Sequence, residues 1–291
     1  MNAHPLPCPI LDTHLHVWDL DRFRYPWLDD IPFLNRSFFL DDYNAACGPL
    51  EVDRMVFVQC ECEPAQSRQE AAWITALAKT DPRIQGIVAW APLEKGEAAR
   101  EDLEALKTAN PLLCGIRRII QFEEDLKFCL RPDFIEGVRV LGEFGLTFDI
   151  CIDHRHGEQA ARMAEQIPEV RMIVDHIGKP PIAAGAFEPW ATHLARLADL
   201  PHVWCKVSSL ATEADHDRWT EQDLKPFVDH VFEHFGFDRT VFAGDWPVSS
   251  LAADLPTCVQ TILNLVGDRA SETDLRALFR DNGNRFYGLA S

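Results

Sequence analysis

The chain of 291 residues is acidic, with 46 Asp and Glu against 28 Lys and Arg and a net charge of −18. Such a surface repels phosphate backbones and anionic lipid, so we expect neither nucleic-acid binding nor attachment to a membrane. Hydrophobic residues make up 47% of the chain and charged residues 25%, which excludes a disordered or fibrous protein. Residues 1–12 show no pattern of an export signal and the nine cysteines are scattered, so we expect a cytoplasmic protein with reduced thiols.

Eight short apolar segments recur along the chain, and helical sequence accompanies them. Continuous rather than alternating hydrophobicity is typical of strands buried on both faces of a parallel sheet. The predicted strands span residues 10–17, 54–60, 84–93, 112–120, 146–153, 170–177, 202–210 and 239–246. The predicted helices span 65–79, 96–109, 132–145, 157–167, 187–200, 221–236, 255–266 and 271–288. This pattern predicts an α/β fold, a (β/α)8 TIM barrel that forms a single domain over residues 1–291.

The longest segment without a predicted strand follows the first strand and covers residues 18–53. It is rich in aromatic residues and too long for an ordinary connection. We therefore expect a long aromatic loop above the barrel, with a functional role.

Polar side chains gather at the ends of the predicted strands, where a TIM barrel builds its active site. His14 and His16 face the same side of the first strand because alternate residues of a strand do. Two imidazoles on one face require partners, which a divalent metal or a hydrogen-bond network would supply. The later strand ends hold Gln59, Glu61, Trp90, Arg117, Arg118, His154, Asp175, His176, Lys179, Lys206 and Asp245.

Some of these residues have a purely structural interpretation. Asp175 and His176 would also fit a hydrogen-bonded pair in the core, and Asp245 would also fit the N-cap of a turn. Lys206 stands in the middle of an apolar strand, so it requires a buried partner or a ligand.

Five motifs together resemble the amidohydrolase superfamily and its amidohydrolase-2 branch: DTHLHVWD, YPWL, VDHIGKP, CKVSSL and FAGDWPV. This branch contains sugar lactonases of the L-fuconolactonase and L-rhamnonolactonase types and 2-pyrone-4,6-dicarboxylate lactonase. The resemblance extends from residue 10 to about residue 287. It implies a barrel hydrolase that opens a cyclic ester with water. By position, the catalytic residues would be His14, His16, His176 and Asp245, and the substrate-binding residues Gln59, Trp27, Trp90 and Arg117, to which we add Lys206.

The same resemblance implies a metal site, with one departure from the family pattern. Binuclear amidohydrolases have a bridging lysine or glutamate on the fourth strand, whereas this chain has GIRRII there. We therefore expect at most one zinc ion, bound by His14, His16 and Asp245, with His154 and His176 as further candidate ligands. A metal-independent mechanism, as in the pyrone lactonases that the chain resembles, stays open.

We predict that Asp245 activates a water molecule that opens a small lactone, and we favour a sugar aldonolactone. His14 and His16 would stabilise the oxyanion, with or without zinc. The alternatives are a pyrone dicarboxylate-type lactone as the substrate, a metal-dependent decarboxylase of an aromatic carboxylic acid, or a binding protein without activity. The only partner that the sequence indicates is the small-molecule lactone.

Overall fold

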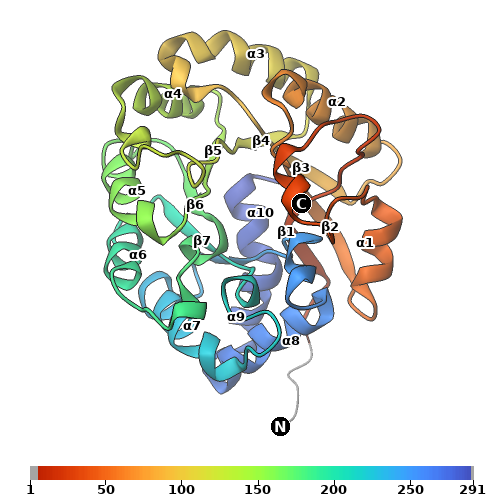
Figure 1. Cartoon of the computed structure of the whole chain (residues 1–291), viewed down its shortest axis with the longest axis vertical. Coiled ribbons are helices and arrows are strands. Elements are labelled where there is room, and N and C mark those ends of the chain that lie inside the picture. The colour runs from red at the N-terminus through yellow and green to blue at the C-terminus, as the bar shows by residue number, and fades with distance from the viewer. Residues whose placement is uncertain (1–5, 290–291) are drawn as a thin grey trace.

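The computed structural model describes residues 6–289, whose strands form one eight-stranded parallel sheet in the order β1 to β8. Figure 1 shows the strands surrounded by helices. The strands are β1 (Ile10–Leu15), β2 (Val52–Val58), β3 (Ile84–Ala89), β4 (Leu113–Ile116), β5 (Thr147–Ile150), β6 (Met172–Val174), β7 (Val203–Val207) and β8 (Thr240–Phe242). Leu15 forms a parallel bridge with Trp246, just beyond β8, so the sheet nearly closes on itself. The predicted (β/α)8 TIM barrel is thereby confirmed.

Each predicted helix has a counterpart in the structure. The helices are α1 (Leu40–Cys47), α2 (Ser67–Leu77), α3 (Ala99–Ala109), α4 (Pro132–Glu143), α5 (Gly157–Ala164), α6 (Trp190–Ala198), α7 (Glu221–Phe235), α8 (Leu255–Val266), α9 (Glu272–Arg276) and α10 (Asn282–Tyr287). Among the described residues, no helix combines the length and the apolar character that crossing a membrane requires. The prediction of one domain over 1–291 stays a prediction, and it includes residues 1–5 and 290–291, which lie outside the described part.

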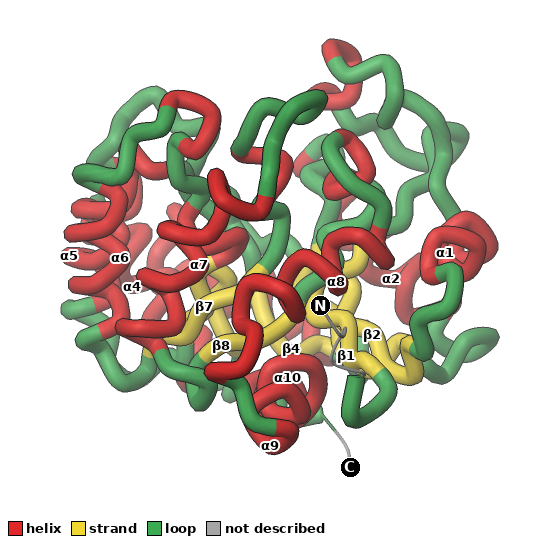
Figure 2. The backbone as a smooth tube through the Cα atoms, turned by 90° about the horizontal axis from the view of Figure 1, so that it is seen from below, coloured by secondary structure: helices red, strands yellow, loops and turns green. Residues whose placement is uncertain are grey.

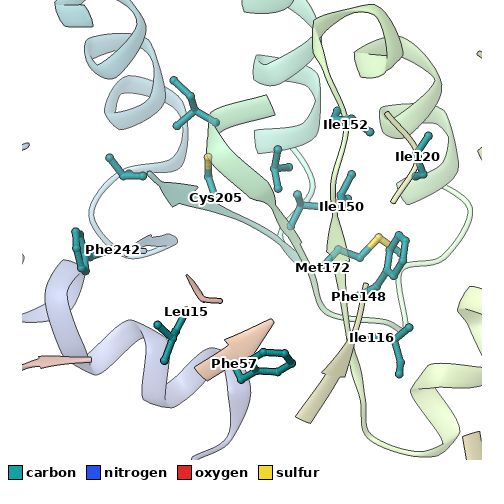
Figure 3. Packing of buried hydrophobic residues seen from close by; sticks show 14 of the residues in the cluster. Leu15, Phe57, Ile116, Ile120, Phe148, Ile150, Ile152, Met172, Cys205 and Phe242 are labelled. Carbon is teal, nitrogen blue, oxygen red and sulfur yellow. The ribbon is translucent and has the colours of Figure 1, made fainter. Parts of the chain in front are cut away.

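Two core layers follow from the alternation of side chains along the strands. Outward-facing residues such as Phe57, Phe148 and Met172 pack between the sheet and the helices (Figure 3). Inward-facing residues, among them Leu11 of β1, pack instead against Phe286 of α10. In Figure 2, α9 and α10 lie at the edge of the strands opposite the long loops. Because α10 fills that end of the barrel, the site must open at the other end.

The structure refines two predicted segments. The segment 18–53 is not a plain loop, because α1 forms inside it with buried Tyr43 and Cys47 facing the core. Asp42 accepts a hydrogen bond from the backbone N–H of Phe39 and so caps this helix. The predicted helix 271–288 is interrupted at Ala277–Asp281 by a wider π-helical turn, within which both Leu278 and Phe279 are buried.

Candidate active site

A cleft opens at the C-terminal ends of the strands, where TIM barrels place their active sites. Its walls come from loops that follow several different strands. The acidic, basic and histidine side chains that line it are those of His16, Glu61, Arg117, His176, Lys179 and Asp245.

The predicted catalytic residues meet at this cleft. His14 Nε2 lies 3.1 Å from His16 Nε2. Asp245 Oδ1 lies 3.6 Å from His14 Nε2 and 3.4 Å from His16 Nε2. The Nε2 atom of His176 lies 3.8 Å from the same carboxylate oxygen. The barrel thus brings together three imidazoles and one carboxylate that are up to 231 positions apart in the chain (245 minus 14).

Asp12 attaches the end of β8 to β1 and so sets the distance between His14 and Asp245. Its Oδ1 atom accepts hydrogen bonds from the backbone N–H groups of His14 at 3.0 Å and Gly244 at 2.7 Å. Its Oδ2 atom accepts one from the Tyr43 hydroxyl at 2.7 Å. A Cβ atom at position 244 would lie 2.3 Å from Asp12 Oδ2, so this close approach requires glycine.

Hydrogen bonds orient the rings toward the centre of the cluster. His16 Nδ1 lies 2.7 Å from the carbonyl oxygen of Val58 and donates to it, which leaves the Nε2 lone pair facing Asp245. His14 Nδ1 lies 3.0 Å from the Lys206 ammonium, a donor, and 3.5 Å from Asp175 Oδ1, an acceptor. Its Nε2 atom faces His16 and Asp245.

The donor set fits a zinc ion. Zinc bound at about 2.0–2.1 Å in a tetrahedral site requires donor atoms about 3.3–3.4 Å apart. The three separations among His14 Nε2, His16 Nε2 and Asp245 Oδ1 are 3.1, 3.6 and 3.4 Å. Two histidines and one carboxylate would leave a fourth position for water or substrate.

Arg117 competes for one of these donors. Its NH1 atom lies 3.0 Å from His14 Nε2 and 3.2 Å from Asp175 Oδ2, and its NH2 atom donates to the carbonyl of Gln59. A metal at His14 must therefore displace one hydrogen bond of this guanidinium. Arg117 lines the cleft, as predicted from the sequence, but its guanidinium already has three partners within the protein.

Burial and charge set the protonation states of the cluster. Burial lowers the pKa of His14, of His16 and of His176, the last to about 4, so all three rings are neutral at pH 7. Burial alone would raise the pKa of Asp245, but His176, His16 and His14 outweigh it and hold that pKa below its ordinary value. Neutral imidazoles and an ionised carboxylate are the forms that bind a metal ion.

Lys206 lies beneath the cluster, inside the barrel. Its Nζ atom is 2.6 Å from Asp149 Oδ2, 2.9 Å from Asp175 Oδ1 and 3.0 Å from His14 Nδ1. The hydroxyl of Tyr287 on α10 also donates to Asp149. The expectation that Lys206 contacts the substrate is corrected here, because the side chain has no exposed surface and points into the barrel rather than into the cleft.

Three further predicted site residues lie away from the cluster. Trp90 lines a separate hollow next to Pro64 and Lys95, because it follows the last residue of β3 and turns outward. His154 lies in another hollow, between α5 and α6, so the structure does not bring it to the candidate ligands. Gln59 is buried and bonds Glu61 instead of lining the cleft. Trp27, in contrast, lines the cleft and donates its indole N–H to the Cys60 carbonyl.

The structure adds residues that sequence reasoning left without a role. Glu61, Lys179 and the exposed Phe122 line the cleft. Asp149 lies in the interior of a buried strand, and that position marks it in the sequence as a group that requires a buried partner. The residues Glu61, His176, Ile177, Lys179, Ser209 and Asp245 all have positive φ angles of 47–56°. Such unfavourable backbone conformations in non-glycine residues concentrate at functional sites.

Glu70 on α2 is a buried carboxyl group whose raised pKa can be tested through the pH dependence of stability. It accepts a hydrogen bond from the Tyr25 hydroxyl at 3.0 Å, and burial raises its pKa from an ordinary value of 4.5 to about 7. Between these values the folded state binds a proton that the unfolded state has released. The free energy of unfolding should therefore fall as the pH rises from about 4.5 to above 7.

Glu70→Gln removes this proton linkage. We expect the free energy of unfolding of the variant, relative to that of the wild type, to rise by on the order of 2 kcal/mol between about pH 5 and about pH 8. Urea unfolding at these two pH values measures it. The exposed Glu104→Gln on α3 serves as the control and should follow the wild type. A parallel pH dependence in Glu70→Gln and the wild type would contradict the raised pKa.

The fold and the site define a (β/α)8 barrel with a histidine–carboxylate cluster at the C-terminal ends of its strands. The chain belongs to the amidohydrolase family represented by the Amidohydro_2 model, which matches residues 11–289. This match confirms the resemblance inferred from the sequence motifs.

Curated and solved relatives share nearly the whole chain. The L-fucono-1,5-lactonase of Burkholderia multivorans is 29% identical over 290 residues, covering 96% of each chain. A crystal structure of an amidohydrolase from Burkholderia multivorans with bound zinc superposes with a TM-score of 0.87 at 28% identity, covering 97% of this chain and 100% of that one. A probable 2-pyrone-4,6-dicarboxylic acid hydrolase from Acinetobacter baumannii shares the fold, with a TM-score of 0.77 at 16% identity over 97% of this chain and 100% of that one.

Proposed function

We propose that this protein hydrolyses a neutral, hydroxylated lactone such as a sugar aldonolactone. The observation that supports this most is the ionised Asp245 carboxylate, which faces three neutral imidazoles at the base of an open cleft. Opening a lactone requires an activated water, a polarised carbonyl and a proton for the departing alkoxide, and these groups can supply all three.

Asp245 is the proton acceptor for the attacking water in this proposal. Ser209 donates a hydrogen bond to Asp245 Oδ2, which leaves Oδ1 on the side of the histidines. His176 is held by a 2.9 Å hydrogen bond between its Nδ1 atom and Ser208 Oγ, and its Nε2 atom, 3.8 Å from Asp245 Oδ1, can relay to the ring oxygen the proton that Asp245 has taken from water. His14 and His16 would stabilise the negative charge that develops on the carbonyl oxygen, either through a zinc ion at their Nε2 atoms or, without metal, as the tautomers that carry the proton on Nε2.

The spacing of the donor atoms favours a metal-assisted version of this chemistry. An aspartate carboxylate alone is a weak base for water, and its Oδ1 atom lies 3.6 Å from His14 Nε2 and 3.4 Å from His16 Nε2, close to the separations that tetrahedral zinc requires. Zinc bound by His14, His16 and Asp245 would supply a water of lowered pKa and a Lewis acid for the carbonyl. The zinc in the similar Burkholderia multivorans structure supports this assignment.

The charges around the cleft favour a neutral substrate over a dicarboxylate. Arg117 is bound to Asp175 and His14, and Arg118 is paired with Glu94 at 3.3 Å and with Glu123 at 2.6 Å. Neither arginine of the GIRRII segment is therefore free to anchor a substrate carboxylate. The alternative substrate, a pyrone dicarboxylate, is therefore not supported by either of these arginines. The similarity to an L-fucono-1,5-lactonase supports a sugar lactone.

Metal content and lactone opening, measured on the same preparation, test the proposal. We expect about one zinc per chain by elemental analysis, and acid release from neutral aldonolactones in a pH-indicator assay. Chelation should lower kcat by at least about a hundredfold, and added zinc should restore it.

The other outcomes of this measurement identify the alternatives. Lactone opening that is unaffected by chelation, in protein without metal, would leave His14 and His16 as hydrogen-bond donors to the oxyanion. Bound metal without any lactone opening would refute the proposal and favour the metal-dependent decarboxylase, which is then tested by carbon dioxide release from aromatic carboxylic acids.

A further inference from the structure

Glu61 is a second carboxylate in the cleft that the proposed hydrolysis does not use. It follows β2 and lines the same cleft as Asp245 and His176. Its φ angle of 56° is unfavourable for a residue with a Cβ atom, so the surrounding structure must hold it in this conformation. A side chain kept in place at such a cost is a candidate for a direct role in binding.

Gln59 positions the Glu61 carboxylate. Gln59 Nε2 donates to Glu61 Oε2 at 2.8 Å, and the Glu61 backbone N–H donates to Gln59 Oε1 at 2.5 Å. Gln59 is itself buried, with 1% of its surface exposed. Among the described residues, no donor is bonded to the remaining oxygen, Oε1 of Glu61, which is therefore available to a molecule in the cleft.

The other walls of the cleft fit a ring with one apolar face and hydroxyl groups at its edge. Trp27 and the exposed Phe122 offer aromatic surface, and Ile119 adds an aliphatic one. Lys179 lines the cleft without an ion pair in the described part of the chain, and it provides a donor for hydroxyl or carbonyl oxygen. The cleft thus contains the two carboxylates of Asp245 and Glu61, and Lys179 as a cation without an ion pair among the described residues.

We propose that Glu61 determines the substrate specificity of the cleft: its free oxygen accepts a hydrogen bond from a ring hydroxyl of a neutral lactone, and its charge repels lactones that bear a carboxylate. This assignment rests on the proposed lactonase function and identifies the residue that recognises the substrate. A hydrogen bond to a charged acceptor is stronger than one between neutral groups, so a single hydroxyl can be discriminated strongly. A like charge at short range disfavours the anionic substrate.

Three groups of test compounds and three variants distinguish this role of Glu61 from a structural one. The substrates are the best neutral aldonolactone of an initial screen, its monodeoxy analogues, and 2-pyrone-4,6-dicarboxylate as a competitive inhibitor. The variants are Glu61→Ala, Glu61→Gln and, as a control on the same loop, Glu63→Gln, whose side chain is exposed. Because burial raises the pKa of Glu61, the assays are run at about pH 8, far above the ordinary pKa of a glutamate.

We expect Glu61→Ala to lower kcat/KM for the hydroxylated lactone about tenfold or more, mainly through KM. For the one deoxy analogue that lacks the contacted hydroxyl, the wild type should show the same loss and Glu61→Ala no further loss, as a double-mutant cycle requires. Glu61→Gln should bind 2-pyrone-4,6-dicarboxylate at least about fivefold more tightly than the wild type. Glu63→Gln should change none of these values.

Equal losses on all the analogues, with no gain in affinity for the dicarboxylate, would overturn the specificity role and leave Glu61 a structural residue. The gain in affinity is informative even if the variant is less stable, because unfolding cannot create it. A wild-type protein that opens no lactone at all would instead refute the proposed function, and the two failures are therefore distinguishable.

Discussion

Asp245→Asn is expected to lower kcat by about a thousandfold or more while the protein stays folded. The amide keeps the size of the side chain but cannot accept a proton from water. It also replaces a charged ligand of the candidate metal site by a neutral one. Asp245 Oδ1 lies within 3.8 Å of the Nε2 atoms of His14, His16 and His176, so the substitution changes the centre of the cluster.

The measurement combines steady-state kinetics with metal content and circular dichroism. Asp217→Asn is the matched control, since Asp217 is exposed in the loop between β7 and α7 at the same end of the barrel. The control should keep wild-type kinetics. An Asp245→Asn variant with near wild-type turnover would eliminate Asp245 as the base and move that role to another group in the cleft.

Lys206→Met is expected to destabilise the fold by about 3–5 kcal/mol, because it leaves Asp149 buried without its counter-charge and Asp175 with Arg117 alone. Lys206 and its partners Asp149 and Asp175 have no exposed side-chain surface, so water cannot replace the ammonium. For a chain of this size that loss corresponds to a decrease in Tm of roughly 6–20 °C.

Thermal unfolding of a matched set checks this expectation. Lys225→Met removes an exposed lysine that pairs with Asp229 along α7, and it should change stability by less than about 1 kcal/mol. The double variant Lys206→Met with Asp149→Asn should recover part of the loss, because it removes the carboxylate charge that is left unpaired. Equal Tm values for Lys206→Met and Lys225→Met would show that the buried network does not need the ammonium.

The polar network also connects the two ends of the barrel. Tyr287 on α10 donates to Asp149, Asp149 pairs with Lys206, and Lys206 contacts His14. The helix that closes one end of the barrel therefore supports a candidate metal ligand at the other end. For this reason Lys206→Met should lower activity as well as stability, although Lys206 does not reach the cleft.

The sequence by itself determined the barrel and predicted which residues form the centre of the candidate site. Eight apolar segments separated by helical sequence admit few arrangements other than a parallel barrel, because strands buried on both faces need helices around them. The alternation of side chains placed His14 and His16 on one side of β1, and parallel strands bring their carboxyl ends to one edge. Asp245 had to lie near the two histidines once the barrel nearly closed between β1 and β8.

Only the tertiary structure decided which of the other polar residues face the cleft. The alternation of side chains ends where each strand ends. Beyond that point, residues with positive φ angles such as Glu61 and Lys179 change the direction of the backbone, and the hydrophobic pattern of the strands does not predict this change. Trp90 consequently turned away from the cleft, and Glu61 entered it. Lys206 and Asp149 met inside the barrel because two buried charges of opposite sign are stable only in contact, and the sequence does not state which pairs will be neighbours.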